Sequence, residues 1–361
     1  MDRHDVPEKI TAEDIAQLHR EDLKIQDKFN CKALTYWFDE KRKNAFCLVE
    51  APNANAIHAM HKQAHGEVPA TIIEVNAGIV ESFLGRIQDP EKGKNETQAI
   101  IREGAFRIIM VIELKPSGPL HGADENLAAS SSEFSNKVID TLTAHAGKLV
   151  TQSLYYYLVS FTSASNAVHA ASGIQSLFKE FKKDMLHNLK LKTGLSAGLP
   201  VTKRPSFFED AIKLAEHMCE IIKGEIIISA RVRELYENEN AGMLNKTNIF
   251  FLTNADENFV TQLMEYVDTC WNNINLKVDD FSKQMHCSKS QLYRKLTALT
   301  GYSPNSFIKE YRLKEALKLL NNSDGNISEI AFKTGFSSPS YFSKCFQKKY
   351  GCMPSQLPGM N

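Results

Sequence analysis

The chain has 361 residues, of which 43% are hydrophobic and 24% are charged, and its 43 basic and 43 acidic residues balance to a net charge of zero. No apolar run approaches the roughly 18 residues of a membrane-spanning helix, and the first residues lack the apolar core of a secretory signal. Seven cysteines without a C-x-x-C pair favour reduced thiols over a disulfide framework or a zinc knuckle. We therefore expect a cytoplasmic protein of two or three globular domains, with no membrane partner.

The first 78 residues follow the ferredoxin-like order of strand, helix, strand, strand, helix and strand. The predicted elements are, in that order, 3–6, 11–29, 33–40, 45–51, 54–65 and 71–75. Segments 10–23, 34–53 and 61–75 resemble a small bacterial protein family named for nickel binding. The resemblance implies an α+β domain over residues 1–78 that binds a metal.

Three histidines, His58, His61 and His65, share one face of the predicted helix 54–65. His61 and His65 are four residues apart and can ligate one ion, whereas His58 lies about 10 Å along the axis from His65. Further ligands could come from Cys47, His19, Glu50 or Glu74. Such donors suit nickel, zinc or copper, and the donor types alone do not identify which of these metals binds. We predict His61 and His65 as ligands of nickel or another divalent transition metal, with His58 as a third candidate. The alternative is a packed or solvated helix face without an ion.

Residues 79–104, with their charges and a lone proline, are expected to be a linker, and residues 105–255 an α/β layer domain. Apolar strand-like runs cover 106–114, 147–161, 189–199 and 224–230, and helical patterns cover 135–146, 165–181 and 208–222. This order, with the motifs at 160–175 and 214–229, resembles the class III nucleotide cyclase homology domain.

The positions that carry the chemistry of that family are altered here. Class III cyclases use two aspartates to hold divalent metal ions, which neutralise phosphate charge as the ring closes. The matching positions are Glu113 and Tyr155, and the flanking glycines are replaced by Leu154 and Tyr156. A tyrosine cannot replace a bridging carboxylate, so we expect no catalytic residues.

The asparagine and arginine that serve ribose and phosphate in the family fall on Lys213 and His217. The resemblance therefore implies a degenerate domain, without a bound cofactor, that pairs two chains or binds a ligand in the altered pocket. Residues 155–157 are all tyrosines that could line such a pocket, although an aromatic trio on a strand is more often packing.

The C-terminal part is basic, with 13 Lys and Arg against 6 Asp and Glu from residue 276 onward. Residues 288–304 repeat at 337–354 with an offset of fifty, and each copy follows a short amphipathic helix and a tight turn. The pattern predicts two helix-turn-helix units joined by a helix over 304–320. In such a unit, the leading residues of the second helix read base edges and basic residues grip phosphates.

Segments 312–320 and 327–356 resemble the DNA-binding domain of the AraC/XylS family of bacterial transcription regulators, which we assign to residues 256–361. The candidate DNA contacts are Ser288, Lys289, Gln291, Arg294, Ser338, Ser340, Tyr341, Lys344, Lys348 and Lys349. The expected core residues of the two units are Leu292, Leu296, Phe342 and Phe346.

The sequence thus predicts a multidomain α/β and all-α protein without enzymatic activity. We expect a transcriptional regulator that binds operator DNA as a homodimer, paired through the cyclase-like domain and controlled by a metal or small molecule. Two alternatives stay open, namely an active nucleotide cyclase and a metal-buffering protein, each with an accessory DNA-binding module.

Overall fold

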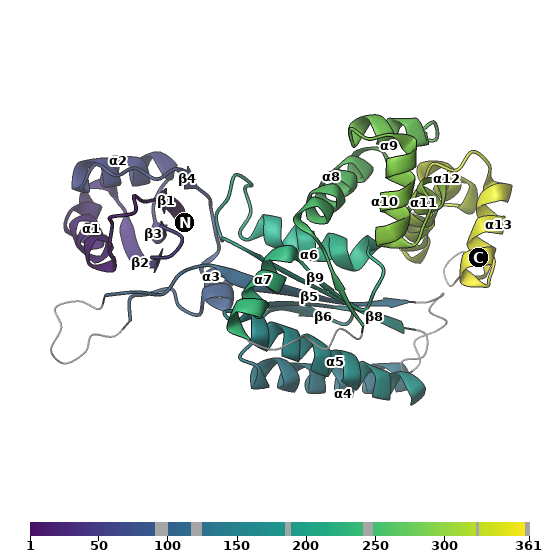
Figure 1. Cartoon of the computed structure of the whole chain (residues 1–361), viewed down its shortest axis with the longest axis horizontal. Coiled ribbons are helices and arrows are strands. Elements are labelled where there is room, and N and C mark those ends of the chain that lie inside the picture. Colours follow the sequence, from purple (N-terminus) through teal and green to yellow (C-terminus); the bar gives the residue numbers. More distant parts are fainter. Residues whose placement is uncertain (91–99, 117–124, 185–188, 241–247, 323–324, 358–361) are drawn as a thin grey trace.

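The computed structural model describes residues 1–90, 100–116, 125–184, 189–240, 248–322 and 325–357. Figure 1 shows three parts laid out along the long axis, with the N-terminal part at one end and the C-terminal helices at the other. In the described part of the chain, no helix is both long and apolar enough to cross a membrane.

The N-terminal part is a four-stranded antiparallel sheet with two helices. Its elements are β1 (Asp2–Asp5), α1 (Ala12–Ile25), the short helix η1 (Gln26–Phe29), β2 (Lys32–Asp39), β3 (Asn44–Glu50), α2 (Ala54–Ala64) and β4 (Thr71–Ile72). Helix α1 begins after a capping box at Thr11, and α2 begins where the Asn53 side chain accepts a bond from a free backbone N–H group. The strand order β2-β3-β1-β4 confirms the ferredoxin-like fold.

A packed helix, α3 (Ala77–Leu84), occupies part of the stretch that we expected to be a linker. Its Val80, Phe83 and Leu84 are buried, because they face β6 and β7 of the central domain. The guanidinium of Arg107 donates to the carbonyls of Phe83 at 3.2 Å and Leu84 at 3.3 Å. The helix is therefore fastened to the central sheet. The rest of the expected linker includes residues 91–99, which lie outside the described residues.

The central domain is a six-stranded mixed sheet with helices on both faces, as expected for an α/β layer. Its elements are β5 (Arg107–Pro116), α4 (Glu125–Ala144), β6 (Lys148–Ser153), β7 (Tyr156–Phe161), α5 (Ala164–Asp184), β8 (Leu189–Gly198), α6 (Glu209–Ile221), β9 (Ile226–Ile228), α7 (Ala230–Glu239) and β10 (Ile249–Phe251). The strand order is β10-β9-β8-β5-β7-β6, with β8, β9 and β10 parallel and the other pairs antiparallel.

The single strand that we expected over 147–161 is wrong, because the chain turns at residues 154 and 155 to form the hairpin β6–β7. Successive side chains of β5 point to opposite faces of the sheet. Ile108 and Met110 pack under α4, α5 and α7, whereas Ile109 and Val111 face α6 and the helices beyond it. Figure 1 shows α4 and α5 on one side of the sheet and α6 on the other.

The C-terminal part is helical and contains the two expected helix-turn-helix units. Its helices are α8 (Asn254–Cys270), α9 (Val278–Gln284), α10 (Lys289–Thr300), α11 (Pro304–Asn321), α12 (Ile327–Lys333) and α13 (Pro339–Tyr350), followed by the short helix η2 (Pro354–Gln356). Pairs α9–α10 and α12–α13 form the units, and α11 connects them. The four residues expected in their cores, Leu292, Leu296, Phe342 and Phe346, are buried.

The two turns differ by one residue. Helices α9 and α12 start 49 residues apart, whereas the second helices α10 and α13 start 50 apart, so the second turn is longer. Each turn contains one left-handed residue, His286 at φ 48° in the first unit and Gly335 at φ 77° in the second.

One apolar cluster runs through all three parts of the molecule. It includes Trp37 of the N-terminal sheet, Phe83 of α3, Phe208 before α6, and Phe281 and Phe307 of the helical part. The second helix-turn-helix unit has its own core around Leu313, Phe342 and Phe346. The first unit is therefore continuous with the central domain, whereas the second rests on α11.

Candidate functional site

His61 of α2 is held between two buried carboxylates. Its imidazole is 1% exposed, with Nδ1 at 3.0 Å from Asp22 Oδ1 and Nε2 at 3.2 Å from Asp2 Oδ2. Asp22 comes from α1 and Asp2 from β1, so the histidine joins both helices to the sheet. Because both ring nitrogens face an acceptor, both can donate only when the ring is protonated.

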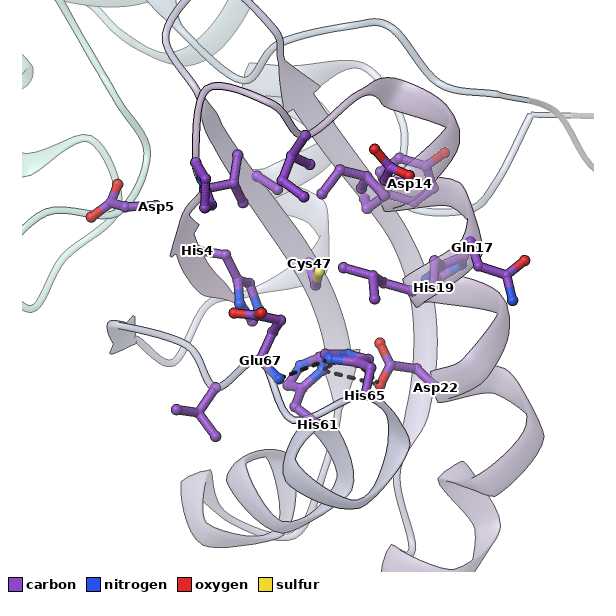
Figure 2. Close-up of a pocket in the computed structure, with 18 of the residues that line it drawn as sticks. His4, Asp5, Asp14, Gln17, His19, Asp22, Cys47, His61, His65 and Glu67 are labelled. Carbon is purple, nitrogen blue, oxygen red and sulfur yellow. Dashed lines mark hydrogen bonds and ion pairs between the residues drawn. The ribbon is translucent and has the colours of Figure 1, made fainter.

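His65 closes the first group of possible metal ligands. Its Nε2 lies 3.3 Å from Asp22 Oδ1 and 3.3 Å from Nδ1 of His61, while its Nδ1 accepts the backbone N–H of Glu67. The three ligand atoms of Asp22, His61 and His65 all lie within 4.8 Å of one another. Figure 2 shows the two histidines and Asp22 converging at one end of the cavity.

A second group of possible metal ligands lies next to the first and has its own carboxylate, that of Asp2. Asp2 Oδ1 lies 3.3 Å from Nε2 of His4 and accepts the backbone N–H of Cys47 at 3.2 Å. The ligand atoms of Asp2, His4 and Cys47 also lie within 4.8 Å of one another. Both groups therefore meet at His61, which contacts an aspartate from each.

The protonation states follow from burial and charge. Burial opposes the charged imidazolium of His61, but the hydrogen bonds and charges of Asp2 and Asp22 outweigh it and raise its pKa to about 9. Burial likewise opposes the Asp2 carboxylate, yet hydrogen bonds from His4 and His61 lower its pKa. Burial, and then the charge of Asp2, raise the pKa of the Cys47 thiol well above its ordinary value. Without a bound cation, the cluster is therefore a protonated imidazole between two carboxylates beside a neutral thiol.

This donor set fits a divalent transition metal. Imidazole, carboxylate and thiolate are its usual ligands, and the cation would replace the proton that now sits between the carboxylates. A cavity of about 650 Å³ gives access to the cluster, with His4, Asp22, Cys47, His61 and His65 in its wall (Figure 2).

The sequence identified part of this cluster. The structure brings His61, His65 and Cys47 together, but it leaves His58 exposed on the outer face of α2 and outside both groups. Of the other candidates, His19 pairs with Asp89 at 3.1 Å, and Glu50 and Glu74 are exposed. The sequence analysis missed Asp2, His4 and Asp22.

Those three residues carried local signals. Asp2 and His4 are two apart on a strand and therefore point to the same face of the sheet. Asp22 lies three residues after His19 on α1, so the two share a helix face.

The first helix-turn-helix unit exposes the leading residues of α10. The side chain of Ser288 caps the helix, and the side-chain oxygen of Gln291 accepts the backbone N–H of Ser288 at 2.9 Å. Lys289 pairs with Asp279 of α9 at 2.6 Å, and Arg294 is exposed. Ser288 and Gln291 thus have structural roles, and Arg294 is free to reach outward from the same helix.

The second unit presents a similar surface. Ser338 caps α13 by accepting the backbone N–H of Tyr341, whose side chain is 52% exposed. Ser340, Lys344 and Lys348 are exposed, whereas Lys349 binds both the carbonyl and the carboxylate of Glu310. Lys349 is therefore turned toward α11.

The altered positions of the central domain have other partners. Glu113 pairs with Lys115 at 2.7 Å, Lys213 pairs with Glu209 at 2.6 Å, and burial lowers the pKa of His217. The hydroxyl of Tyr156 donates to Glu216 at 2.9 Å, and Tyr157 is buried. Tyr155 and Tyr157 pack in the apolar cluster on one side of the central sheet and Tyr156 packs in the cluster on the other side, so all three take part in packing.

Two helix-turn-helix units on one connecting helix are the architecture of a DNA-binding module. The C-terminal part is therefore a DNA-binding domain by its fold. Residues 281–358 match the family described as "Helix-turn-helix domain", and residues 1–75 match the family described as "Nickel responsive protein SCO4226-like". These matches confirm the architecture that the sequence predicted at both ends of the chain.

Curated relatives are similar over parts of the chain. A stretch of 130 residues is 38% identical to Histidine kinase P4 of Formosa agariphila, covering 36% of this chain and 9% of that protein. A stretch of 80 residues is 38% identical to the HTH-type transcriptional regulator ExsA of Pseudomonas aeruginosa, covering 22% of this chain and 29% of that protein. A stretch of 143 residues is 27% identical to the HTH-type transcriptional activator RhaR of Salmonella dublin, covering 40% of this chain and 46% of that protein. The chain thus spans less than half the length of each relative.

Solved structures also align with this chain. A bacterial light-regulated adenylyl cyclase aligns with 74% of this chain and 99% of its own, at 12% identity and a TM-score of 0.33. The DNA-binding domain of AdpA in complex with a target DNA aligns with 26% of this chain and 85% of its own, at 23% identity and a TM-score of 0.25. At these scores the alignments assign no activity to the central domain.

Proposed function

We propose that this protein is a sequence-specific DNA-binding transcriptional regulator whose N-terminal domain binds a divalent transition metal. The observation that carries the first part is the pair of helix-turn-helix units inside a segment that matches a helix-turn-helix family. The names of two relatives, a transcriptional regulator and a transcriptional activator, support it. Base contacts would come from Ser340, Tyr341 and Arg294, and phosphate contacts from Lys344 and Lys348.

The test of DNA binding starts from sequences selected by the full chain out of a random duplex pool. We expect Arg294→Ala to weaken binding of the selected duplex by about 1–3 kcal/mol, while Lys203→Ala, at an exposed lysine of the central domain, leaves it unchanged. Affinity should also fall steeply with salt, with a logarithmic slope of about −0.9 per phosphate contact. A flat salt response, or no selected sequence, would contradict the proposal.

The metal part rests on the ligand cluster and on the match to a family described as nickel responsive. His61, His65 and Asp22 would hold the ion, with Asp2, His4 and Cys47 as the adjoining donors. When bound, the ion supplies positive charge between the carboxylates of α1 and β1. Nickel is the first candidate because of the match to the nickel-responsive family. The donor types alone also suit zinc and copper.

Metal content after equilibration with nickel, zinc and copper tests this part. We expect one or two ions per chain in the wild type and a loss in His61→Ala/His65→Ala. His58→Ala is the matched control, because this histidine belongs to the same helix but lies outside the cluster. Equal metal content in all three proteins would show that the cluster is a structural hydrogen-bond network.

We propose further that the central domain is not an enzyme and that it pairs two chains. Tyr155 at the position of a metal-binding aspartate supports the first statement. Turnover of ATP or GTP with manganese would refute it and favour a cyclase. Sedimentation of the full chain would test the dimer, and a monomer at micromolar concentration would refute the second statement.

A further inference from the structure

A second cavity, of about 550 Å³, lies where the central domain meets the helix-turn-helix part. The central domain contributes Lys115 from β5, Lys190 from β8, and Glu220 with Ile221 from α6. Helix α11 contributes most of the opposite wall, and α13 contributes Lys349 and Tyr350. Its occupant would therefore touch both domains at once.

The wall of this cavity is rich in lysine. Five lysines line it, namely Lys115, Lys190, Lys314, Lys318 and Lys349, against two carboxylates, Glu220 and Glu310. Ion pairs join Lys314 to Glu220 and Lys349 to Glu310, while Lys115 and Lys318 pair with Glu113 and Glu315 just outside the lining. Lys190 is exposed and has no carboxylate partner among the described residues.

The positive charges act on one another. Burial, and then the charge of Lys115, lower the pKa of the neighbouring Lys192 to about 8, and Lys190 adds to this effect. Burial lowers the pKa of Lys314, and Lys115 lowers it further against the attraction of Glu220. Lys192 lies just outside the lining, and the charges of Glu113 and Glu220 raise the pKa of Lys115 against the effect of burial, so the lysine without a carboxylate partner, Lys190, is the first candidate to meet an anion.

Most of the remaining wall is aromatic or aliphatic. Tyr302, Tyr311 and Tyr350 line the cavity, and the side chain of Tyr302 is 44% exposed. Small-molecule sites are commonly concave, with a few charged groups set in an apolar or aromatic wall, and their volumes run from about 300 to 1,000 Å³. The cavity has the size and the lining of such a site.

We propose that this cavity binds a small organic phosphate, with its phosphate group at Lys190 and Lys318 and its organic part against the tyrosines. Duplex DNA is a poorer occupant, because α13 contributes its last turn here rather than its leading residues Ser340 and Tyr341. The site is separate from the metal cluster and stands whether or not the N-terminal domain binds an ion.

Such a ligand would affect DNA binding by changing how the second helix-turn-helix unit is placed relative to the central domain. Lys349 and Tyr350 belong to the second helix-turn-helix unit, whose core is separate from that of the central domain. The occupant would bridge this unit to β5 and β8, and would bias the arrangement of the two units if it binds one arrangement more tightly.

Calorimetric titration of the full chain with AMP, adenosine and inorganic phosphate tests the proposal. We expect AMP to bind once per chain and adenosine not to bind. Lys190→Gln/Lys318→Gln should weaken AMP binding at least about tenfold, because hydrogen bonds to charged groups are lost. Both lysines are exposed, with Lys318 57% exposed, so the variant should fold normally. Lys203→Gln is the matched control and should bind AMP like the wild type.

The other outcomes are equally definite. Inorganic phosphate that binds as tightly as AMP would support the site and show that the phosphate group alone is recognised. No binding of AMP or phosphate at millimolar concentration would overturn the proposal, as would equal AMP binding by the double variant. A double variant that loses affinity for duplex DNA, in a protein that binds neither small anion, would assign these lysines to the DNA surface instead.

Discussion

His61 contacts two carboxylates that belong to different elements. The second proton on its imidazole ring therefore matters for the stability of the N-terminal domain. The ring bridges Asp2 of β1 and Asp22 of α1. Removing one partner of such a buried charged set leaves the others desolvated and unpaired, which is strongly destabilising. The same arrangement favours a cation between the two aspartates, because a positive charge offsets both negative ones.

The stability of the metal-free N-terminal domain should fall as the pH rises toward 10. The pKa of His61 in the folded chain, about 9, exceeds its ordinary value of 6.5. Its contribution is therefore complete below pH 6.5 and is lost as the pH rises through 9, with an upper bound of about 3 kcal/mol. Urea unfolding followed by the fluorescence of buried Trp37, in a Trp271→Phe background with chelator present, measures it.

His58→Gln should keep this pH dependence, and His61→Gln should lose it. Equal stability of the wild type at pH 6.5 and pH 9.5 would show that His61 is neutral in the folded protein.

The sequence predicted His61 and His65 because their helical spacing is visible in one dimension, and it offered Cys47 as one of four further donors. It missed Asp2 and Asp22, since their approach to His61 depends on how β1 and α1 pack against α2. His58 lies exposed and outside the cluster, because a shared helix face does not tell which residues on that face turn inward.

The turns of the helix-turn-helix units are the elements that decide their geometry. Gly335 in the second turn and Gly301, which ends α10 outside the first turn, are both left-handed, at φ 77° and 82°, but their surroundings differ. A Cβ on Gly301 would meet no atom within 4 Å, whereas one on Gly335 would lie 2.7 Å from the Asn272 carbonyl and 2.9 Å from Nε of Arg312. The second turn is therefore pressed against the segment that follows α8.

Gly335→Ala should destabilise the helical part by about 3 kcal/mol or more, because it adds a steric clash to the left-handed strain. Gly301→Ala carries the strain alone, so it should cost about 1–2 kcal/mol. Thermal unfolding followed by circular dichroism compares them. Equal losses in the two variants would mean that the second turn moves freely away from Asn272.

Two element-level predictions failed for the same physical reason. The hairpin turn at Leu154 and Tyr155 contains no Gly, Pro, Asn or Asp, so the run from 147 to 161 had the pattern of one strand. Helix α3 has only eight residues, and its helicity depends on packing against β6 and β7. In both places, tertiary contacts decide the structure without a local signal.

At the scale of the whole molecule, the cavity beside His61 is joined to the central domain by a short series of contacts. His19 lines the cavity and pairs with Asp89, just after α3, and Arg3 donates to the carbonyl of Val201 at 3.3 Å. Helix α3 is then held by Arg107. A structural change at the cavity can therefore reach the central sheet through residues that are in direct contact.

If metal binding alters DNA affinity, DNA must alter metal affinity by the same factor. We expect this factor to be about 5 to 150, and smaller in Asp89→Asn, which keeps the metal ligands but weakens the contact with His19. Nickel titrations with and without saturating selected duplex measure it. A factor of one in the wild type would show that the two ends work independently.

The apolar cluster that runs from Trp37 through Phe83 and Phe208 to Phe307 also bears on how such a protein can evolve. Gene segments that encode independently folded domains can be exchanged between proteins with little repair. Here a foreign sensor would have to bring a surface that fits Phe83 and its neighbours, and a poor fit would leave them in water. New signals would therefore arise more readily by single substitutions around the cavities than by recombination at the domain borders.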